Sequence, residues 1–185
     1  MRLNAVAISC VSLLSALLLT GCGNSDSAKI STITFKSAAI DGTTIPTRYT
    51  CDGADTSPPL EWGEVPTGTG TLVLFVVGVL PEPATNSYKL SVEWAVAGVN
   101  PSLHRLSAGQ LPPGAYVGEA TDGKRHYSIC PKRGQRKQYQ FELYALPAAD
   151  SVVREFAGGP VLLRLARKAS PAIGHGDFIA SYKGV

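Results

Sequence analysis

Cysteine and histidine are the residues of this chain with the widest chemistry, because their side chains bind metals and act as nucleophiles or bases. The sequence has four cysteines and three histidines. The chain has no Cys-x-x-Cys motif, and His104, His126 and His175 are far from one another in sequence. The ligand spacing of a zinc site is therefore missing. The hydrolase motifs Gly-x-Ser-x-Gly and His-Glu-x-x-His are missing as well. We therefore predict no metal site, no cofactor and no catalytic residue.

The first cysteine chemistry that the sequence predicts is lipidation. Arg2 precedes a nearly uncharged, apolar run over residues 5–19, which has the length of a secretory signal. A membrane-spanning helix needs about 20 apolar residues, and this run stops short of that. It ends at residues 19–22 (Leu-Thr-Gly-Cys), which resemble the lipobox of bacterial lipoproteins, where cleavage precedes a lipid-carrying cysteine. We expect Cys22 to carry that lipid; the alternative is an ordinary secretory signal that leaves Cys22 free.

This interpretation divides the chain into three parts. Residues 1–21 are the expected signal peptide, residues 22–29 the lipidated cysteine with a small polar tether, and residues 30–185 a single folded domain. Several acyl chains on one cysteine anchor a protein stably in a membrane. Gly23 stands where inner-membrane lipoproteins usually carry aspartate. We therefore predict a protein of the bacterial cell envelope, anchored in the outer membrane and facing the periplasm.

The other cysteines are explained by export. Cys10 leaves with the signal peptide and Cys22 takes the lipid, so Cys51 and Cys130 remain in an oxidising compartment. We predict a disulfide between them. The alternative is a pair of buried free thiols.

The charges of the chain exclude one class of partner. The 17 basic and 14 acidic residues nearly balance, and the basic ones form no stripe of the kind that binds nucleic acid. One basic cluster stands out, made of Lys132, Arg133, Arg136 and Lys137. It is either a solvated loop or an attractor for anions and acidic lipid head groups.

Composition and patterning predict a mainly β domain. Apolar residues are 44% and charged residues 17% of the chain, which excludes a disordered chain or a coiled coil, and 19 glycines with 13 prolines indicate many turns. Residues 71–80 are β-branched and almost wholly apolar, as in a strand buried on both faces, with Pro81 ending it. A polar connection is expected over residues 83–89. The other expected strands or extended segments are 33–40, 45–50, 90–99, 126–130, 138–146 and 177–183. Two short helices are expected near the C-terminus, over 151–157 and 160–168.

Six sequence blocks, in order, carry a resemblance to a known family. They are residues 49–53 (Tyr-Thr-Cys-Asp-Gly), 57–62 (Ser-Pro-Pro-Leu-Glu-Trp), 65–69 (Val-Pro-Thr-Gly-Thr), 93–96 (Glu-Trp-Ala-Val), 130–131 (Cys-Pro) and 139–146 (Tyr-Gln-Phe-Glu-Leu-Tyr-Ala-Leu). From about Ile33 to its end, the chain resembles the phosphatidylethanolamine-binding protein (PEBP) family, in its bacterial Raf-kinase-inhibitor-like branch. The resemblance implies a large antiparallel sheet packed on a smaller sheet, with one or two short C-terminal helices.

The resemblance also implies a small anion pocket at one end of the sheet, but most of its residues are changed here. In the family, two aspartates, two histidines and a tyrosine line this pocket, which accepts phosphate-like head groups and acetate. The aspartate positions align with Val79 and Pro81, the histidine positions with Glu93 and Lys137, and the tyrosine with Tyr139. The candidate ligand-binding residues that follow from this alignment are Glu93, Lys137, Tyr139, Pro131, Glu82 and Asp52.

The exchanged charges allow two interpretations. Glu93 and Lys137 could pair with each other and close the pocket. Alternatively, Lys137 and Tyr139 could donate to an anionic oxygen while Glu93 orients the lysine. The favoured hypothesis is a non-catalytic binding module, anchored to a membrane by its lipid and carrying an altered pocket for a small anion or phospho head group. The alternative is a protein-interaction module, such as a kinase or protease inhibitor, acting through its surface and first of all through the basic loop.

Overall fold

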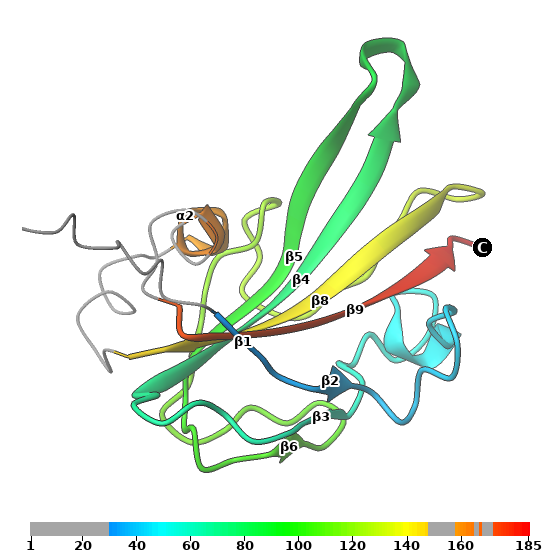
Figure 1. Cartoon of the computed structure of the whole chain (residues 1–185). Coiled ribbons are helices and arrows are strands. Elements are labelled where there is room, and N and C mark those ends of the chain that lie inside the picture. The colour runs from blue at the N-terminus through cyan, green and yellow to red at the C-terminus, as the bar shows by residue number, and fades with distance from the viewer. Residues whose placement is uncertain (1–29, 148–157, 165–166, 168–171) are drawn as a thin grey trace, which may run out of the picture.

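The computed structural model describes residues 30–147, 158–164, 167 and 172–185, and it shows two β-sheets (Figure 1). Neighbouring strands are antiparallel in both sheets, apart from β1 and β9, which are parallel. The six-stranded sheet has the order β1 (Ser31–Thr32), β9 (Gly174–Lys183), β8 (Arg136–Leu146), β4 (Thr71–Glu82), β5 (Ser87–Val99) and β7 (Tyr116–Val117). The three-stranded sheet has the order β2 (Phe35–Lys36), β3 (Leu60–Trp62) and β6 (Arg105–Leu106). The predicted fold class, a large sheet on a smaller one, is confirmed.

Strand β4 is the centre of the fold, because each of its faces belongs to a different core. Leu72, Leu74 and Val76 pack with the three-stranded sheet in one cluster. Val73 and Phe75 belong to a second cluster on the opposite face, with Leu163 of the short helix α2 (Gly159–Arg164). Figure 1 shows α2 and the smaller sheet on opposite sides of the large sheet. The predicted strand buried on both faces is therefore confirmed.

The connection after β4 differs from the prediction. Residues 83–89 do not form a polar loop: β4 continues to Glu82, the 3-10 turn η2 (Pro83–Thr85) follows, and β5 starts at Ser87. The result is a long hairpin that projects beyond the other strands (Figure 1). Pro81 is tolerated inside β4 because the ladder with β8 ends at Val79, so the missing backbone donor of Pro81 lies at an open edge.

The first part of the domain contains less regular structure than expected. Strand 33–40 is reduced to β2, because the chain leaves the large sheet after β1 and crosses to the small one. The expected extended segment 45–50 contains the 3-10 turn η1 (Thr47–Tyr49). Segment 126–130 forms no strand; the backbone N–H of Cys51 donates to the carbonyl oxygen of Ile129 at 3.1 Å.

The last elements agree with the predictions within a few residues. Strand β8 starts two residues earlier than expected and β9 three residues earlier. The second predicted helix, 160–168, is observed as α2. The first, 151–157, lies outside the described residues, as do the signal peptide, Cys22 and the tether. Within the described ranges, no helix has the length and apolar character needed to cross a membrane.

Candidate functional site

Glu93 and Lys137 lie in contact on one face of the large sheet, as the aligned positions predicted. Glu93 comes from β5 and Lys137 from the start of β8, with β4 between them. The Lys137 Nζ donates to Glu93 Oε1 at 2.5 Å and to Ser91 Oγ at 2.8 Å. The Ser91 hydroxyl in turn donates to Glu93 Oε1 at 2.7 Å. The lysine and glutamate side chains are only 15% and 18% exposed, so the pair is largely withdrawn from water.

Gly78 provides the room for this ion pair. It lies on β4, where it pairs with Ser91 on one side and Tyr139 on the other. A side-chain carbon at Gly78 would overlap the end of Lys137 and the carboxylate oxygen of Glu93. Sequence reasoning missed this residue, although a lone glycine in a β-branched strand signals a close approach. The ion pair therefore occupies the space above a bare stretch of backbone.

Tyr139 adds a donor with no partner. Its side chain is fully buried, and within the described residues its hydroxyl makes no hydrogen bond. Burial raises the pKa of Tyr139, and the nearby charge of Glu93 raises it further, so the phenol keeps its proton at neutral pH. The Lys137 Nζ lies 5.5 Å from the centre of the Tyr139 ring. The Lys137 ammonium and the Ser91 hydroxyl both donate to Glu93, and the unpartnered phenol belongs to the residue whose ring lies next to the ammonium.

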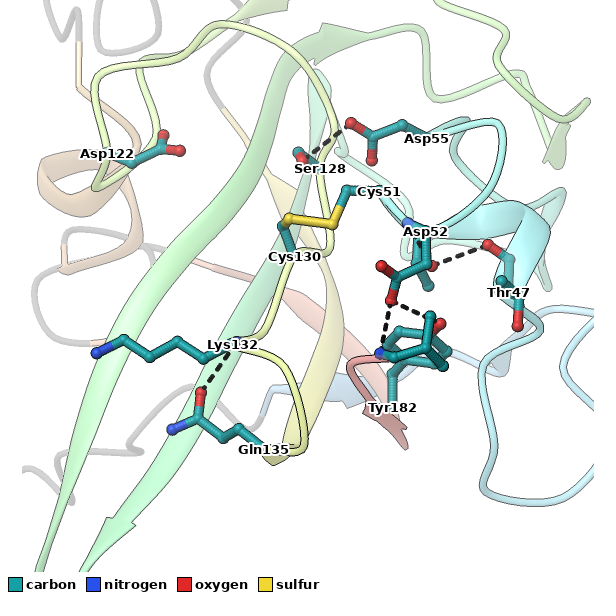
Figure 2. The surroundings of a disulfide bond; sticks show 12 residues. Thr47, Cys51, Asp52, Asp55, Asp122, Ser128, Cys130, Lys132, Gln135 and Tyr182 are labelled. Carbon is teal, nitrogen blue, oxygen red and sulfur yellow. Dashed lines mark hydrogen bonds between the residues drawn. A yellow bond between two sulfur atoms is a disulfide. The ribbon is translucent and has the colours of Figure 1, made fainter.

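Three other predicted site residues have different surroundings. Glu82 lies on the exposed end of the β4–β5 hairpin, four residues beyond Gly78, where it accepts a hydrogen bond from Ser87 at 3.3 Å. It does not lie at the ion pair, because β4 and β5 stay paired as far as Glu82 and Ser87 and carry it away along the hairpin. Pro131 is buried next to Cys130. Asp52 Oδ2 accepts from the Tyr182 hydroxyl at 2.9 Å (Figure 2) and from the backbone N–H of Val185 at 3.1 Å, so it holds the C-terminal segment.

A disulfide joins the two loops beside this region. Cys51 and Cys130 are bonded in the structure, at a sequence separation of 79 (Figure 2). Asp52 follows directly after Cys51, and Pro131 directly after Cys130. The bond therefore fastens the loop that carries Asp52 to the segment that leads into β8 and Lys137.

Comparison with known proteins gives one consistent family. The family model described as phosphatidylethanolamine-binding protein matches residues 35–175. The "Putative lipoprotein LppC" of Mycobacterium tuberculosis is 31% identical over 146 residues, covering 78% of this chain and 68% of the relative. The crystal structure of the "Putative PhosphatidylEthanolamine-Binding Protein (PEBP) Homolog CT736" from Chlamydia trachomatis has a TM-score of 0.70 at 26% identity, covering 84% of this chain and 99% of that one. The fold is also that of Escherichia coli YbcL, with a TM-score of 0.69, 23% identity and coverage of 82% and 98%.

Proposed function

The chain belongs to the phosphatidylethanolamine-binding protein family, and we propose that it acts as a lipid-anchored binding module whose pocket takes a small phosphate-like or carboxylate anion. The cluster of Lys137, Ser91 and Tyr139 is the observation that carries this proposal. Its three donors match the acceptor-only chemistry of such an anion. The module binds its ligand without chemical turnover.

The ion pair determines how this pocket works. In the free protein Glu93 takes the place of the ligand, because its carboxylate accepts from both Lys137 and Ser91. An incoming anion must compete with Glu93 for the same ammonium. We therefore propose a pocket that is shut by an internal carboxylate and opens when Lys137 turns from Glu93 to the ligand.

Phosphate binding is expected to become tighter when Glu93 is neutralised. In an NMR titration of the Gly23–Val185 domain with phosphate and phosphoethanolamine, Glu93→Gln should bind about 10-fold more tightly than the wild type, since the internal competitor is weakened. Lys137→Ala should lose the saturable shifts at Tyr139 and Ser91. Lys132→Ala is the matched control: it removes an exposed lysine of the basic loop and should leave the affinity nearly unchanged.

The same titration distinguishes the alternative function. If neither the wild type nor Glu93→Gln shows saturable shifts at millimolar ligand, the anion pocket is wrong. The protein-interaction hypothesis would then be favoured, with the exposed Lys132 and Arg133 as its first surface to test.

Anchoring through Cys22 is part of the proposal, supported by the lipobox-like sequence and by the relative named as a lipoprotein. Wild-type protein expressed in bacteria is expected in the membrane fraction, with the outer membrane, and Cys22→Ser in the soluble fraction. The measurement is fractionation followed by mass spectrometry of the N-terminal peptide. Cys10→Ser is the control, because that residue should leave with the signal. Membrane recovery of the Cys22→Ser variant would contradict the lipid anchor.

A further inference from the structure

A hollow lies between residues 55–57, Trp94 of β5, Val117 of β7 and residues 125–127. Its volume is about 240 Å³, which is smaller than a pocket for a drug-sized molecule and suits a ligand of a few heavy atoms. Its lining includes Asp55, Trp94, Leu111, Val117, Arg125 and Tyr127. Glu93, Lys137 and Tyr139 do not line it, so it is separate from the anion pocket.

Asp55, one of the lining residues, has a carboxylate oxygen without a hydrogen-bond partner among the described residues. One carboxylate oxygen, Oδ2, accepts from the Ser128 hydroxyl at 3.0 Å, as Figure 2 shows. The other, Oδ1, is buried and has no hydrogen-bond partner among the described residues. A buried carboxylate oxygen without a hydrogen-bond donor lowers the stability of the folded protein. Such an atom is rare, and a bound ligand is one way to satisfy it. A ligand with N–H groups in the hollow would supply that partner after a turn of the Asp55 carboxylate toward it.

The remaining walls fit a cation that carries a hydrocarbon part. Trp94 and Tyr127 meet edge to face, with ring centres 5.6 Å apart, and the Tyr127 hydroxyl is already used on the carbonyl oxygen of Tyr49 at 2.8 Å. Leu111 and Val117 add apolar surface. Aromatic rings and a carboxylate together attract an ammonium group.

Arg125 and His126 also line the hollow, and the permanent charge of Arg125 does not cancel this attraction. The guanidinium of Arg125 pairs with Glu119 at 3.2 Å, so its charge is balanced outside the hollow. Asp55 is the one carboxylate among the lining residues. The Asp55 charge acts on the neighbouring Tyr127: burial raises the pKa of Tyr127, and the Asp55 carboxylate raises it further.

The geometry points to a binding site for an alkylammonium group, with its N–H groups on Asp55 and its hydrocarbon part against Trp94 and Leu111. A short primary amine is the probe that separates this site from the anion pocket. n-Butylammonium chloride titrated into the Gly23–Val185 domain should give saturable shifts at the Trp94 indole and at the backbone amides of Thr56 and Ser57. n-Butanol, with the same hydrocarbon part and no charge, should bind at least about 10-fold more weakly.

Asp55→Asn is the variant that tests the carboxylate. Asp55 has a φ of 49°, a left-handed conformation that asparagine adopts as readily as aspartate, so the backbone should be kept. The affinity for n-butylammonium should fall at least about 10-fold. Asp177→Asn removes an exposed carboxylate elsewhere and should leave the affinity unchanged.

Three results would overturn this inference: no saturable shift of the wild type with n-butylammonium, equal binding of n-butanol, or unchanged affinity in Asp55→Asn. The comparison of amine with alcohol uses the wild-type protein alone. It therefore decides the matter even if Asp55→Asn does not fold.

Discussion

Replacing both Cys51 and Cys130 with alanine is expected to lower the free energy of unfolding by about 2–5 kcal/mol. The bond closes a loop of about 80 residues, and in the chain-entropy model a loop of this length is worth roughly 4.5 kcal/mol. That loop contains the central hairpin of β4 and β5, so the unfolded chain gains much freedom when the link is lost. For a single domain, a loss of this size is a large part of the total stability.

Urea unfolding of the Gly23–Val185 domain measures this effect, with and without a reducing agent. Reduction of the wild type should reproduce most of the loss seen in the double alanine variant. The variant itself should be insensitive to the reducing agent, which makes it the control. Mass spectrometry after thiol labelling gives an independent reading: oxidised wild type should take up no label at Cys51 or Cys130. Full labelling of the unreduced, unfolded protein would contradict the bond.

The sequence predicted the large elements of the fold because they are marked by burial. Strand β4 is apolar on both faces, and buried and more exposed residues alternate along the first half of β8. In both strands the local sequence pattern and the tertiary packing favour the same structure. The small sheet was expected only from the family resemblance. The local sequence pattern did not mark β3 and β6, because they are only two or three residues long and are fixed by partners distant in sequence. The hairpin was missed because Pro81 normally ends a strand, and only the short ladder with β8 makes it tolerable.

The candidate sites were predictable to different degrees. The contact between Glu93 and Lys137 followed from their alignment with two pocket positions of the family, on the strands that flank β4. The role of Gly78 depends on the exact register of three strands, and Glu82 depends on where the hairpin bends, which the local sequence does not determine. Asp55 is not marked as a ligand by the sequence, because aspartate commonly caps turns. Only the three-dimensional packing reveals its buried, unpartnered oxygen.

The second large effect on stability is expected at a buried carboxylate of β8, on the face of the large sheet opposite to Glu93 and Lys137. Glu142 on β8 is only 1% exposed, and it accepts from the Tyr144 hydroxyl at 3.0 Å. Arg167 donates to both of its oxygens, through Nε at 3.3 Å and through a terminal nitrogen. Burial alone would lower the pKa of Arg167, but the hydrogen bond and charge of Glu142 outweigh it and raise the pKa. Each residue of the pair therefore stabilises the charged form of the other.

Arg167→Ala is expected to lower the free energy of unfolding by about 3 kcal/mol, because it leaves a buried charge with Tyr144 as its one donor among the described residues. This is the low end for a buried pair, since the Arg167 side chain is 30% exposed. The double variant Glu142→Gln, Arg167→Ala should recover most of the loss, as the stranded charge is then gone. Arg125→Ala breaks an exposed pair with Glu119 and should change little. If Arg167→Ala were as mild as Arg125→Ala in urea unfolding, Glu142 would have to be solvated or protonated, and the pair would not be holding this face together.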